Sequence, residues 1–467
     1  MNEKAKSLGS ENRGQRAPVL EPFVPTMARW LDGARTDTRS NAQCGQQRMR
    51  AALLFVDMND FVKLMLEADV DVETAGERAY GRPNESYGRQ RAELLQRRRD
   101  ELIRGVLREY FSRLTAIVDA YGGEIISFIG DAMLAGWFAE RGSDDDRELV
   151  SLTRLAAFCA ECVVANVHGS SVCERLRVAL KAMISCGDVI IVNTGDADGE
   201  REALLLGEAV DGLRRLKRSM QPGRVAFSTL GLQLLADGSA SANDISRERP
   251  SNLFASAGFA PDLVFETSAD FTRDALSPAG ASCAACTVTF LRFHPDRDRA
   301  HGEEEFVRDM ELAVRVIQRT MRANGGVVLQ IIVDENGPSC LCAFGIARSR
   351  KHQAPSRAVK STQSTLKAFA KTLPAFRIAA GVCTGSVNLG PAGSAFEPRR
   401  ELTLIGIPVI LAARFADTAI NTLNSGSALM DYATRIELVP CVMPIVTMEM
   451  RLKGFPHPVR AFACGVE

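Results

Sequence analysis

Apolar and polar positions alternate regularly along two stretches of the chain, at about 46–236 and 285–467. The segment between them, 237–284, is rich in Ser, Ala, Asp, Pro and Gly, and residues 1–45 are polar with many Arg, Asn, Gln and Gly. The pattern predicts a disordered N-terminal arm, a first domain, a linker and a second domain.

The first domain begins with an apolar run that predicts a strand, and helical and strand periodicities follow it in turn. A charged, arginine-rich stretch at about 65–100 interrupts this order, and we expect an insertion there. In chain order, the sequence predicts strand 52–56, helix 101–121, hairpin strands 124–128 and 132–138, helix 148–167, strand 177–185, and an apolar segment at 204–207 that leads into a helix.

The second domain repeats the same order of parts. Its predicted elements are strand 287–293, helix 303–323, hairpin strands 327–333 and 340–344, helix 361–372, strand 376–383, and an apolar segment at 403–406 that leads into a helix. Two such βαββαβ units predict an α+β fold, in which two ferredoxin-like domains pack as an intramolecular dimer about a pseudo-two-fold axis. Ligand sites are expected where the two domains meet.

Composition narrows the classes of function. The 467 residues carry 57 basic and 57 acidic side chains, which disfavours a general nucleic-acid binder with its basic excess. The apolar fraction of 46% is enough for sizeable cores. The N-terminus lacks an apolar leader, no uninterrupted apolar run is long enough for a bilayer, and the twelve cysteines do not resemble a disulfide framework. We therefore expect a soluble cytoplasmic protein without a transmembrane segment.

Two carboxylates of the first domain are candidates for chemistry. Asp57 follows the apolar run 53–56, and Asp131 lies at the predicted hairpin turn. If the hairpin pairs beside the first strand, both carboxylates reach one place, where they could hold two divalent ions for phosphoryl transfer. Taken singly, each is more typical of an ordinary turn or strand end than of a metal ligand. Arg292 and Pro338 stand at or near the matching places of the second domain, so we expect one metal site only.

The order of several short motifs is more specific than any one of them. They are residues 54–61 (LFVDMNDF), 122–135 (GGEIISFIGDAMLA), 341–345 (LCAFG), 401–406 (ELTLIG), 412–414 (AAR) and 452–454 (LKG). Together they resemble the class III nucleotidyl cyclases, in particular the tandem-domain soluble adenylyl cyclase type, over most of both domains.

The resemblance implies an adenylate cyclase that converts ATP to 3′,5′-cyclic AMP and pyrophosphate at the domain interface. The 3′-hydroxyl would attack the α-phosphate with the help of two Mg²⁺ or Mn²⁺ ions. The resemblance assigns the two ions to Asp57 and Asp131, together with Met58. Because both domains lie in one chain, a monomer is expected to suffice.

Further roles are implied by the resemblance alone. Arg414 matches the arginine that stabilises charge on the α-phosphoryl group, and Lys181 and Lys453 match lysines that contact phosphates. Gln330 and Thr403 fall at the two positions that read the purine edge. Two more assignments complete the set: Phe61 for substrate binding and Arg214 for an anion in the second, pseudo-symmetric pocket.

Four positions depart from the family pattern. Ile410 replaces an Asn that positions the ribose, and Asp60 replaces a Gly near the triphosphate. Gln330 replaces a Lys of the purine site, and Ser127 replaces a Lys of the second anion pocket. Three alternatives therefore stay open: a weak or inactive nucleotide-binding pseudo-cyclase with a regulatory role, a guanylate or mixed-specificity cyclase, and a scaffold that binds no nucleotide.

Overall fold

The computed structural model describes residues 46–464, apart from several gaps. The gaps are 60, 62–104, 108, 141, 144, 174–175, 196–200, 218–219, 237–281, 296–301, 335–336, 347–352, 393–400, 424 and 439–445. The expected N-terminal arm, the insertion at 65–100 and nearly all of the expected linker therefore lie outside the described residues.

A six-stranded sheet forms the centre of the first domain, with strand order β2-β3-β1-β6-β7 and with β8 beside β6. Its strands are β1 (Gln46–Asn59), β2 (Glu124–Ile129), β3 (Ala132–Phe138), β6 (Ala179–Gly195), β7 (Arg201–Leu206) and β8 (Val225–Phe227). The other elements are a helix over 109–120, α4 (Asp146–Val167), α5 (Glu208–Leu216), α6 (Thr229–Ala236) and the small pair β4 (Ser171–Cys173) and β5 (Leu176–Arg177).

The second domain has the corresponding sheet, with strand order β10-β11-β9-β12-β14-β16-β15 and with β13 beside β12. Its strands are β9 (Ser282–Pro295), β10 (Val327–Asp334), β11 (Gly337–Phe344), β12 (Phe376–Ala392), β13 (Glu401–Ile405), β14 (Ser427–Met430), β15 (Val446–Met450) and β16 (Val459–Cys464). Its helices are α10 (Glu303–Ala323), α11 (Ala354–Thr372), α12 (Ile407–Thr422) and α13 (Tyr432–Ile436).

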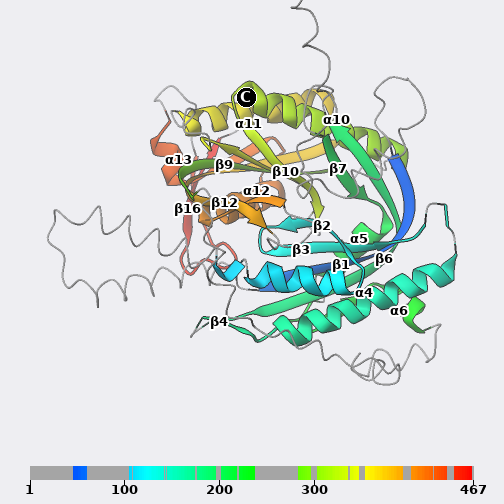
Figure 1. Cartoon of the computed structure of the whole chain (residues 1–467). Helices are drawn as coiled ribbons and strands as arrows, with labels where there is room; N and C mark the ends of the chain where they lie inside the picture. The colour runs from blue at the N-terminus through cyan, green and yellow to red at the C-terminus, as the bar shows by residue number, and fades with distance from the viewer. Residues whose placement is uncertain are drawn as a thin grey trace, which may run out of the picture.

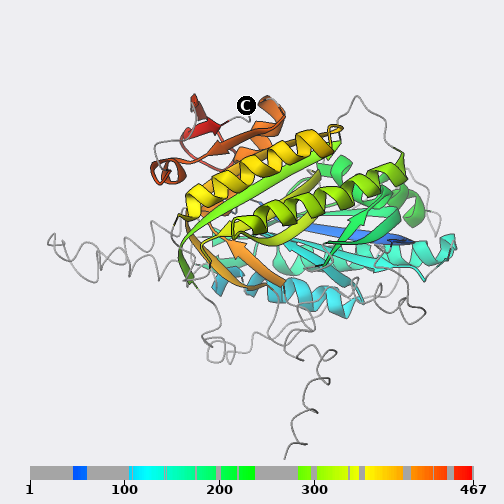
Figure 2. The same ribbon diagram turned by 90° about the horizontal axis from the view of Figure 1, so that it is seen from above.

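Both faces of β1 are buried, which explains its continuous apolar run. Successive side chains of a strand point to opposite faces. Leu54 and Val56 face the helix over 109–120 and α4, whereas Leu53 and Phe55 face α5. The helices of the two domains consequently lie on opposite outer sides, with α10 and α11 above the strands and α4 below them (Figure 1). Figure 2 shows α10 and α11 running along the same side of the molecule.

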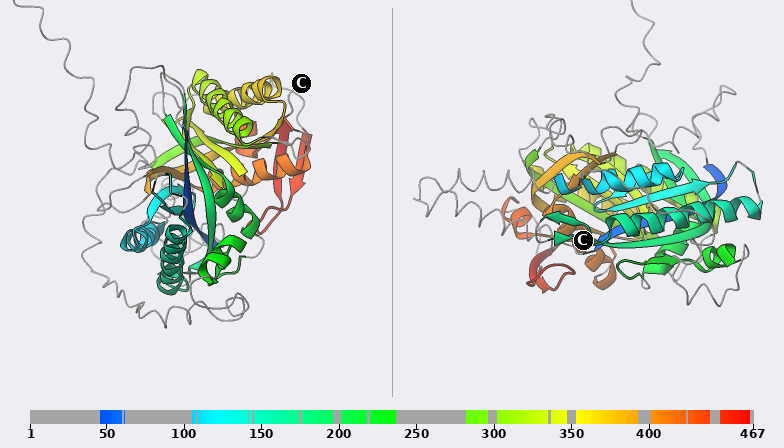
Figure 3. Two further views of the ribbon diagram at one scale, coloured as in Figure 1. Left: turned by 90° about the vertical axis from the view of Figure 1, so that its right-hand side faces the viewer. Right: turned by 60° about the horizontal axis from the view of Figure 1, so that its bottom comes forward.

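The two domains exchange strand arms. Apolar residues of β6 and β7, among them Ile190 and Leu204, belong to the same core as the helices of the second domain. In return, Ile405 at the end of β13 and Ile407 and Ile410 in the first turn of α12 pack against the core of the first domain. The end-on view in Figure 3 shows the two sheets between the outer helix layers. The expected α+β fold with two related domains is confirmed.

The lengths of several elements differ from the expectation. β6 and β12 have 17 residues each and run well past the predicted ends at 185 and 383. Gly187 lies within β6 with a φ of 141°, a conformation that glycine adopts readily, and the strand continues past it. Helix α11 begins at Ala354 rather than at 361.

One described helix, α4, is long and apolar enough by composition to cross a membrane, although Arg154 and Glu161 interrupt its apolar run. Its residues Ala156, Ala160 and Val163 are fully buried in the core of the first domain. A core helix meets the same criterion, so this helix is weak evidence for a membrane span.

We predict that Gly381→Ala destabilises the protein by about 1–3 kcal/mol, the range for overpacked cores. Helix α12 lies so close to β12 that an added Cβ would overlap the Ala412 carbonyl oxygen. Thermal unfolding measures the effect. The matched control, Gly105→Ala, adds a Cβ with nothing within 4 Å and should leave the melting temperature unchanged or slightly raised. Equal melting temperatures for the two variants would contradict the close approach.

Candidate active site

The structure brings the two candidate carboxylates to one end of the first sheet. Asp57 lies near the end of β1, and Asp131 lies in the turn between β2 and β3. β1 pairs with β3 in a register that joins Val56 to Met133, so the two carboxylates belong to neighbouring strand ends. The hairpin pairs beside the first strand as the sequence reasoning required.

Basic side chains from four separate segments surround Asp57. Lys181 is its register partner on β6. Burial raises the pKa of Asp57 above its usual value of 3.8, and the attraction of these cations opposes that rise. In decreasing order of effect, they are Lys181, Lys453, Lys217 and Arg414. The site thus combines a buried acid with a concentration of positive charge.

The cations also influence one another. Lys453 lies in the loop between β15 and β16, and its pKa is lowered by burial and then by repulsion from Lys181 and Arg414. An anionic ligand would reduce the repulsion among these cations, because Asp57 alone does not neutralise them.

A buried tyrosine hydroxyl completes the neighbourhood of the carboxylates. Tyr110, on the helix over 109–120, is 2% exposed, and its hydroxyl group has no hydrogen-bond partner. Burial raises its pKa well above the usual value of 10, and the charges of Asp131 and Asp57 add to the effect. The Tyr110 hydroxyl therefore lies near enough to both carboxylates for their charges to act on it.

The donor set is suited to divalent ions that also bind a ligand. Among the described residues no three His, Cys, Asp or Glu side chains form a metal cluster. Asp57 and Asp131 offer hard oxygen ligands of the type that Mg²⁺ and Mn²⁺ prefer, and such ions commonly complete their coordination with water and phosphate oxygens. The Met58 side chain is buried in the core, so any contribution from this residue would come from its main chain.

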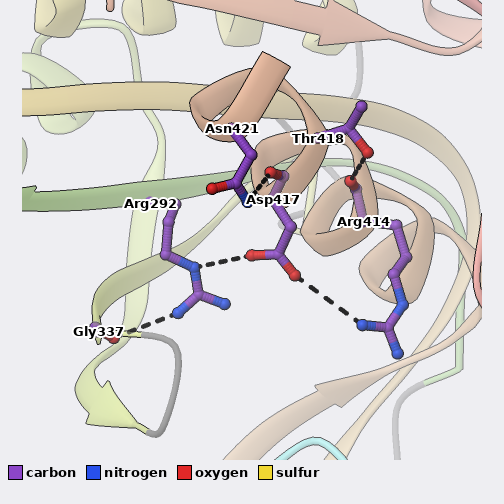
Figure 4. A network of polar contacts seen from close by, with 6 residues as sticks. All are labelled: Arg292, Gly337, Arg414, Asp417, Thr418 and Asn421. Atoms are coloured by element: carbon purple, nitrogen blue, oxygen red, sulfur yellow. Dashed lines mark hydrogen bonds and ion pairs between the residues drawn. The ribbon is translucent and has the colours of Figure 1, made fainter. Parts of the chain in front are cut away.

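Arg414 reaches the site from α12. Its Nη1 lies 3.9 Å from a carboxylate oxygen of Asp417, one turn further along the helix (Figure 4). Its Nε is buried and has no hydrogen-bond partner. One side of this guanidinium is therefore held by an acid, while another donor is left unsatisfied.

The position assigned to the purine is occupied by a hydrogen-bond bridge between the domains. Gln330 on β10 is 8% exposed, and its Nε2 donates to the Ser127 hydroxyl at 2.8 Å and to the Phe128 carbonyl at 2.5 Å. Ser127 and Gln330, which both stand where the family has lysines, thus contact each other. Thr403 lies on β13, where it pairs with Gly390 of β12.

Two other expected positions are apolar contacts in this structure. Phe61 is buried in the core of the first domain, so its ring is held by packing. Ile410, which replaces an Asn of the family pattern, packs against that same core from the second domain. An isoleucine here stabilises the domain interface instead of offering a hydrogen bond.

The pseudo-symmetric place in the second domain carries the opposite charge. β9 and β11 pair Arg292 with Ser339, so Arg292 and Pro338 match Asp57 and Asp131 in register, as the sequence indicated. Arg214 on α5 forms an ion pair with Asp211 at 3.2 Å. It also reaches toward the second domain, because a Cβ on Gly337 would lie 3.6 Å from its Nη2.

Sequence reasoning missed three residues of this neighbourhood: Lys217, Tyr110 and Asp417. A charged residue within or just after a helix is usually part of a solvated face, so Asp417 and Lys217 gave no separate signal. Tyr110 carried the periodicity of an ordinary core residue. Only the tertiary structure places them beside the carboxylates and Arg414.

Comparisons with known proteins agree with this geometry. No family model matches the chain. Adenylate cyclase type 10 from Oryctolagus cuniculus is 21% identical over an alignment of 355 residues, and the match covers 66% of this chain and 21% of that protein. The same enzyme from Rattus norvegicus is 28% identical over 123 residues, 26% of this chain and 7% of that protein. The chain thus spans at most about a fifth of the length of these curated relatives.

A solved structure extends the comparison to nearly the whole chain. A class III adenylyl cyclase-like ATP-binding protein from Pseudomonas aeruginosa superposes with a TM-score of 0.57 and 12% identity. The match covers 89% of this chain and 92% of that one. These findings confirm the resemblance to class III nucleotidyl cyclases, and the chain shares its fold with that cyclase-like protein.

We predict that Gln330→Met lowers the free energy of unfolding by about 1–3 kcal/mol, because it removes two buried hydrogen bonds while keeping the side-chain length. Ser127→Ala removes only the bond to the hydroxyl and should cost about half as much. Urea unfolding at equilibrium measures both. A Gln330→Met variant as stable as Ser127→Ala would mean that the bond to Phe128 does not stabilise the interface.

Proposed function

We propose that the protein is an adenylate cyclase, which converts ATP to 3′,5′-cyclic AMP and pyrophosphate at the interface of its two domains. The observation that carries the proposal is the pair Asp57 and Asp131 surrounded by cations from both domains. A carboxylate pair for divalent ions beside a group of cations suits a metal-bound triphosphate.

In this proposal Asp57 and Asp131 hold two Mg²⁺ or Mn²⁺ ions, which would lower the pKa of the 3′-hydroxyl and neutralise phosphate charge. The lysines around Asp57 bind the phosphate oxygens; they are Lys181, Lys217 and Lys453. Arg414 stabilises the charge that develops on the α-phosphoryl group, a role suited to a guanidinium with an unsatisfied donor. Thr403 and Gln330 read the purine, and Phe61 supports them from the core.

Arg414 and Lys453 come from the second domain, whereas both carboxylates come from the first. One chain can therefore supply the whole site, and we propose that the active unit is a monomer acting in the cytoplasm. Arg214 is proposed to hold an anion in the second pocket.

A second candidate function, nucleotide binding without turnover, is favoured by Ile410. An apolar side chain cannot replace the hydrogen bond of an Asn, and loss of one transition-state donor costs on the order of 10²–10³ in rate. The structural neighbour from Pseudomonas aeruginosa is itself described as cyclase-like and ATP-binding. A guanylate or mixed-specificity cyclase is the third candidate, because a flipped Gln330 amide suits guanine as well as adenine.

The first test is product formation by the purified chain with Mn²⁺ and ATP or GTP. We expect cyclic AMP from the wild type and at least a hundredfold loss in Asp131→Asn, which removes a metal ligand. Cyclic GMP would select the guanylate reading. If no product forms but Mn²⁺-ATP still raises the melting temperature of the wild type and not of Asp131→Asn, the non-catalytic reading is correct.

A second test addresses Ile410. We predict that Ile410→Asn raises kcat at least tenfold while it lowers the melting temperature, because it gains a donor and loses an apolar domain contact. Ile407→Asn is the matched control, since Ile407 packs against the same core and should lose stability without gaining activity. Equal effects of both variants on kcat would rule out a specific role for this position.

A further inference from the structure

Among the residues that the structure describes, Arg292 on β9 is the most deeply buried charged residue, with a side chain only 4% exposed. Its Nε donates to a carboxylate oxygen of Asp417 at 3.0 Å, and its Nη1 donates to the Gly337 carbonyl at 3.2 Å (Figure 4). Its guanidinium also lies 5.2 Å from the ring of Phe290. These contacts fix one guanidinium firmly in the second domain.

Asp417 divides its carboxylate between two arginines. One oxygen accepts the hydrogen bond from Arg292, and the other lies 3.9 Å from Nη1 of Arg414. Thr418 and Asn421, also drawn in Figure 4, donate instead to the carbonyls of Arg414 and Asp417 within the helix. The carboxylate is therefore oriented by Arg292 from the strand and faces Arg414 along α12.

The strand registers show what this arrangement replaces. Asp57 pairs with Lys181 in the first domain, and Arg292 pairs with Ala379 at the equivalent place in the second. Arg292 therefore stands where the first domain has the acid Asp57, and Asp417 neutralises the charge of Arg292. The pseudo-symmetric position thus carries a fixed charge pair in contact with Arg414.

We propose that Asp417 is a positioning residue: held by Arg292, it sets the place of the Arg414 guanidinium for phosphoryl transfer. The inference rests on the proposed cyclase function. The distance of 3.9 Å between Asp417 and Arg414 is too long for a strong hydrogen bond, so the carboxylate orients the guanidinium and leaves its N–H donors available to a ligand. The unsatisfied Nε of Arg414 remains as a donor for a phosphate oxygen.

A double-mutant cycle tests the inference in the full chain with Mn²⁺-ATP. Asp417→Asn in the wild type should lower kcat about tenfold and leave KM within about twofold, because misplacement of Arg414 affects the transition state more than ATP binding. In an Arg414→Ala background the same substitution should change kcat by less than about twofold, since its effect acts through Arg414. A purely structural role would lower kcat equally in both backgrounds.

Asp417→Asn leaves the Arg292 charge buried with a neutral partner, so folding is checked by the melting temperature. If it does not fold, the double variant Arg292→Met and Asp417→Asn buries no unpaired charge and should show the same tenfold fall and the same lack of effect without Arg414. The control Asp146→Asn removes the acid partner of Arg50, a strand arginine at the far end of β1, and should retain the wild-type kcat.

The outcomes separate the two proposals. A wild type that makes no cyclic nucleotide overturns the cyclase function and this inference together. An active wild type overturns the inference alone if Asp417→Asn has full kcat or loses the same factor in both backgrounds.

Discussion

The packing of apolar residues of each domain into the core of the other brings charged groups of the second domain to the carboxylates of the first. Ile190 and Leu204 of the first domain are buried in the core of the second domain, and Ile407 of the second domain packs against the core of the first. Helix α12 begins directly after the β13 arm, so the packing of that arm also places Arg414 beside Asp57. The hydrophobic effect is non-directional, so apolar burial alone does not fix how the two domains are oriented. The orientation comes from strand pairing, because the registers of β6 and β12 fix how far each strand extends beyond its own sheet.

The two domains are nearly symmetric, but they differ in whether the buried charged residue at the equivalent strand position is paired. A buried charge is costly unless it is paired and hydrogen-bonded. The second domain meets this requirement internally, since Asp417 and the Gly337 carbonyl accept from Arg292. The first domain does not, because burial still raises the pKa of Asp57 despite four nearby cations. The unresolved electrostatic cost lies in the first domain, where a bound metal and an anion would relieve it.

Much of this could be predicted from the sequence because it depends on local patterns. Alternating apolar residues predicted the strands, and the repeated order of elements predicted two related domains. The carboxylate pair followed from its place at a strand end and a turn. Lys217, Asp417 and Tyr110 could not be found in this way, because their significance comes from contacts between elements far apart in sequence. The lengths of β6 and β12 were also hidden, since Gly187 is as compatible with a strand end as with a bend.

Two positions near the ligand site that the sequence resemblance implies, Gln330 and Ile410, are uncharged and engaged in contacts between the domains. Gln330 already donates to Ser127 and Phe128, and Ile410 contributes apolar packing. Recognition of a purine by Gln330 would exchange hydrogen bonds within the protein for hydrogen bonds to the base. Such an exchange yields little net free energy, because an intramolecular hydrogen bond contributes only about 0.5–1.5 kcal/mol. Charge at the phosphate end, where Asp57 is surrounded by cations, would therefore dominate nucleotide binding, and discrimination between purines would be weak.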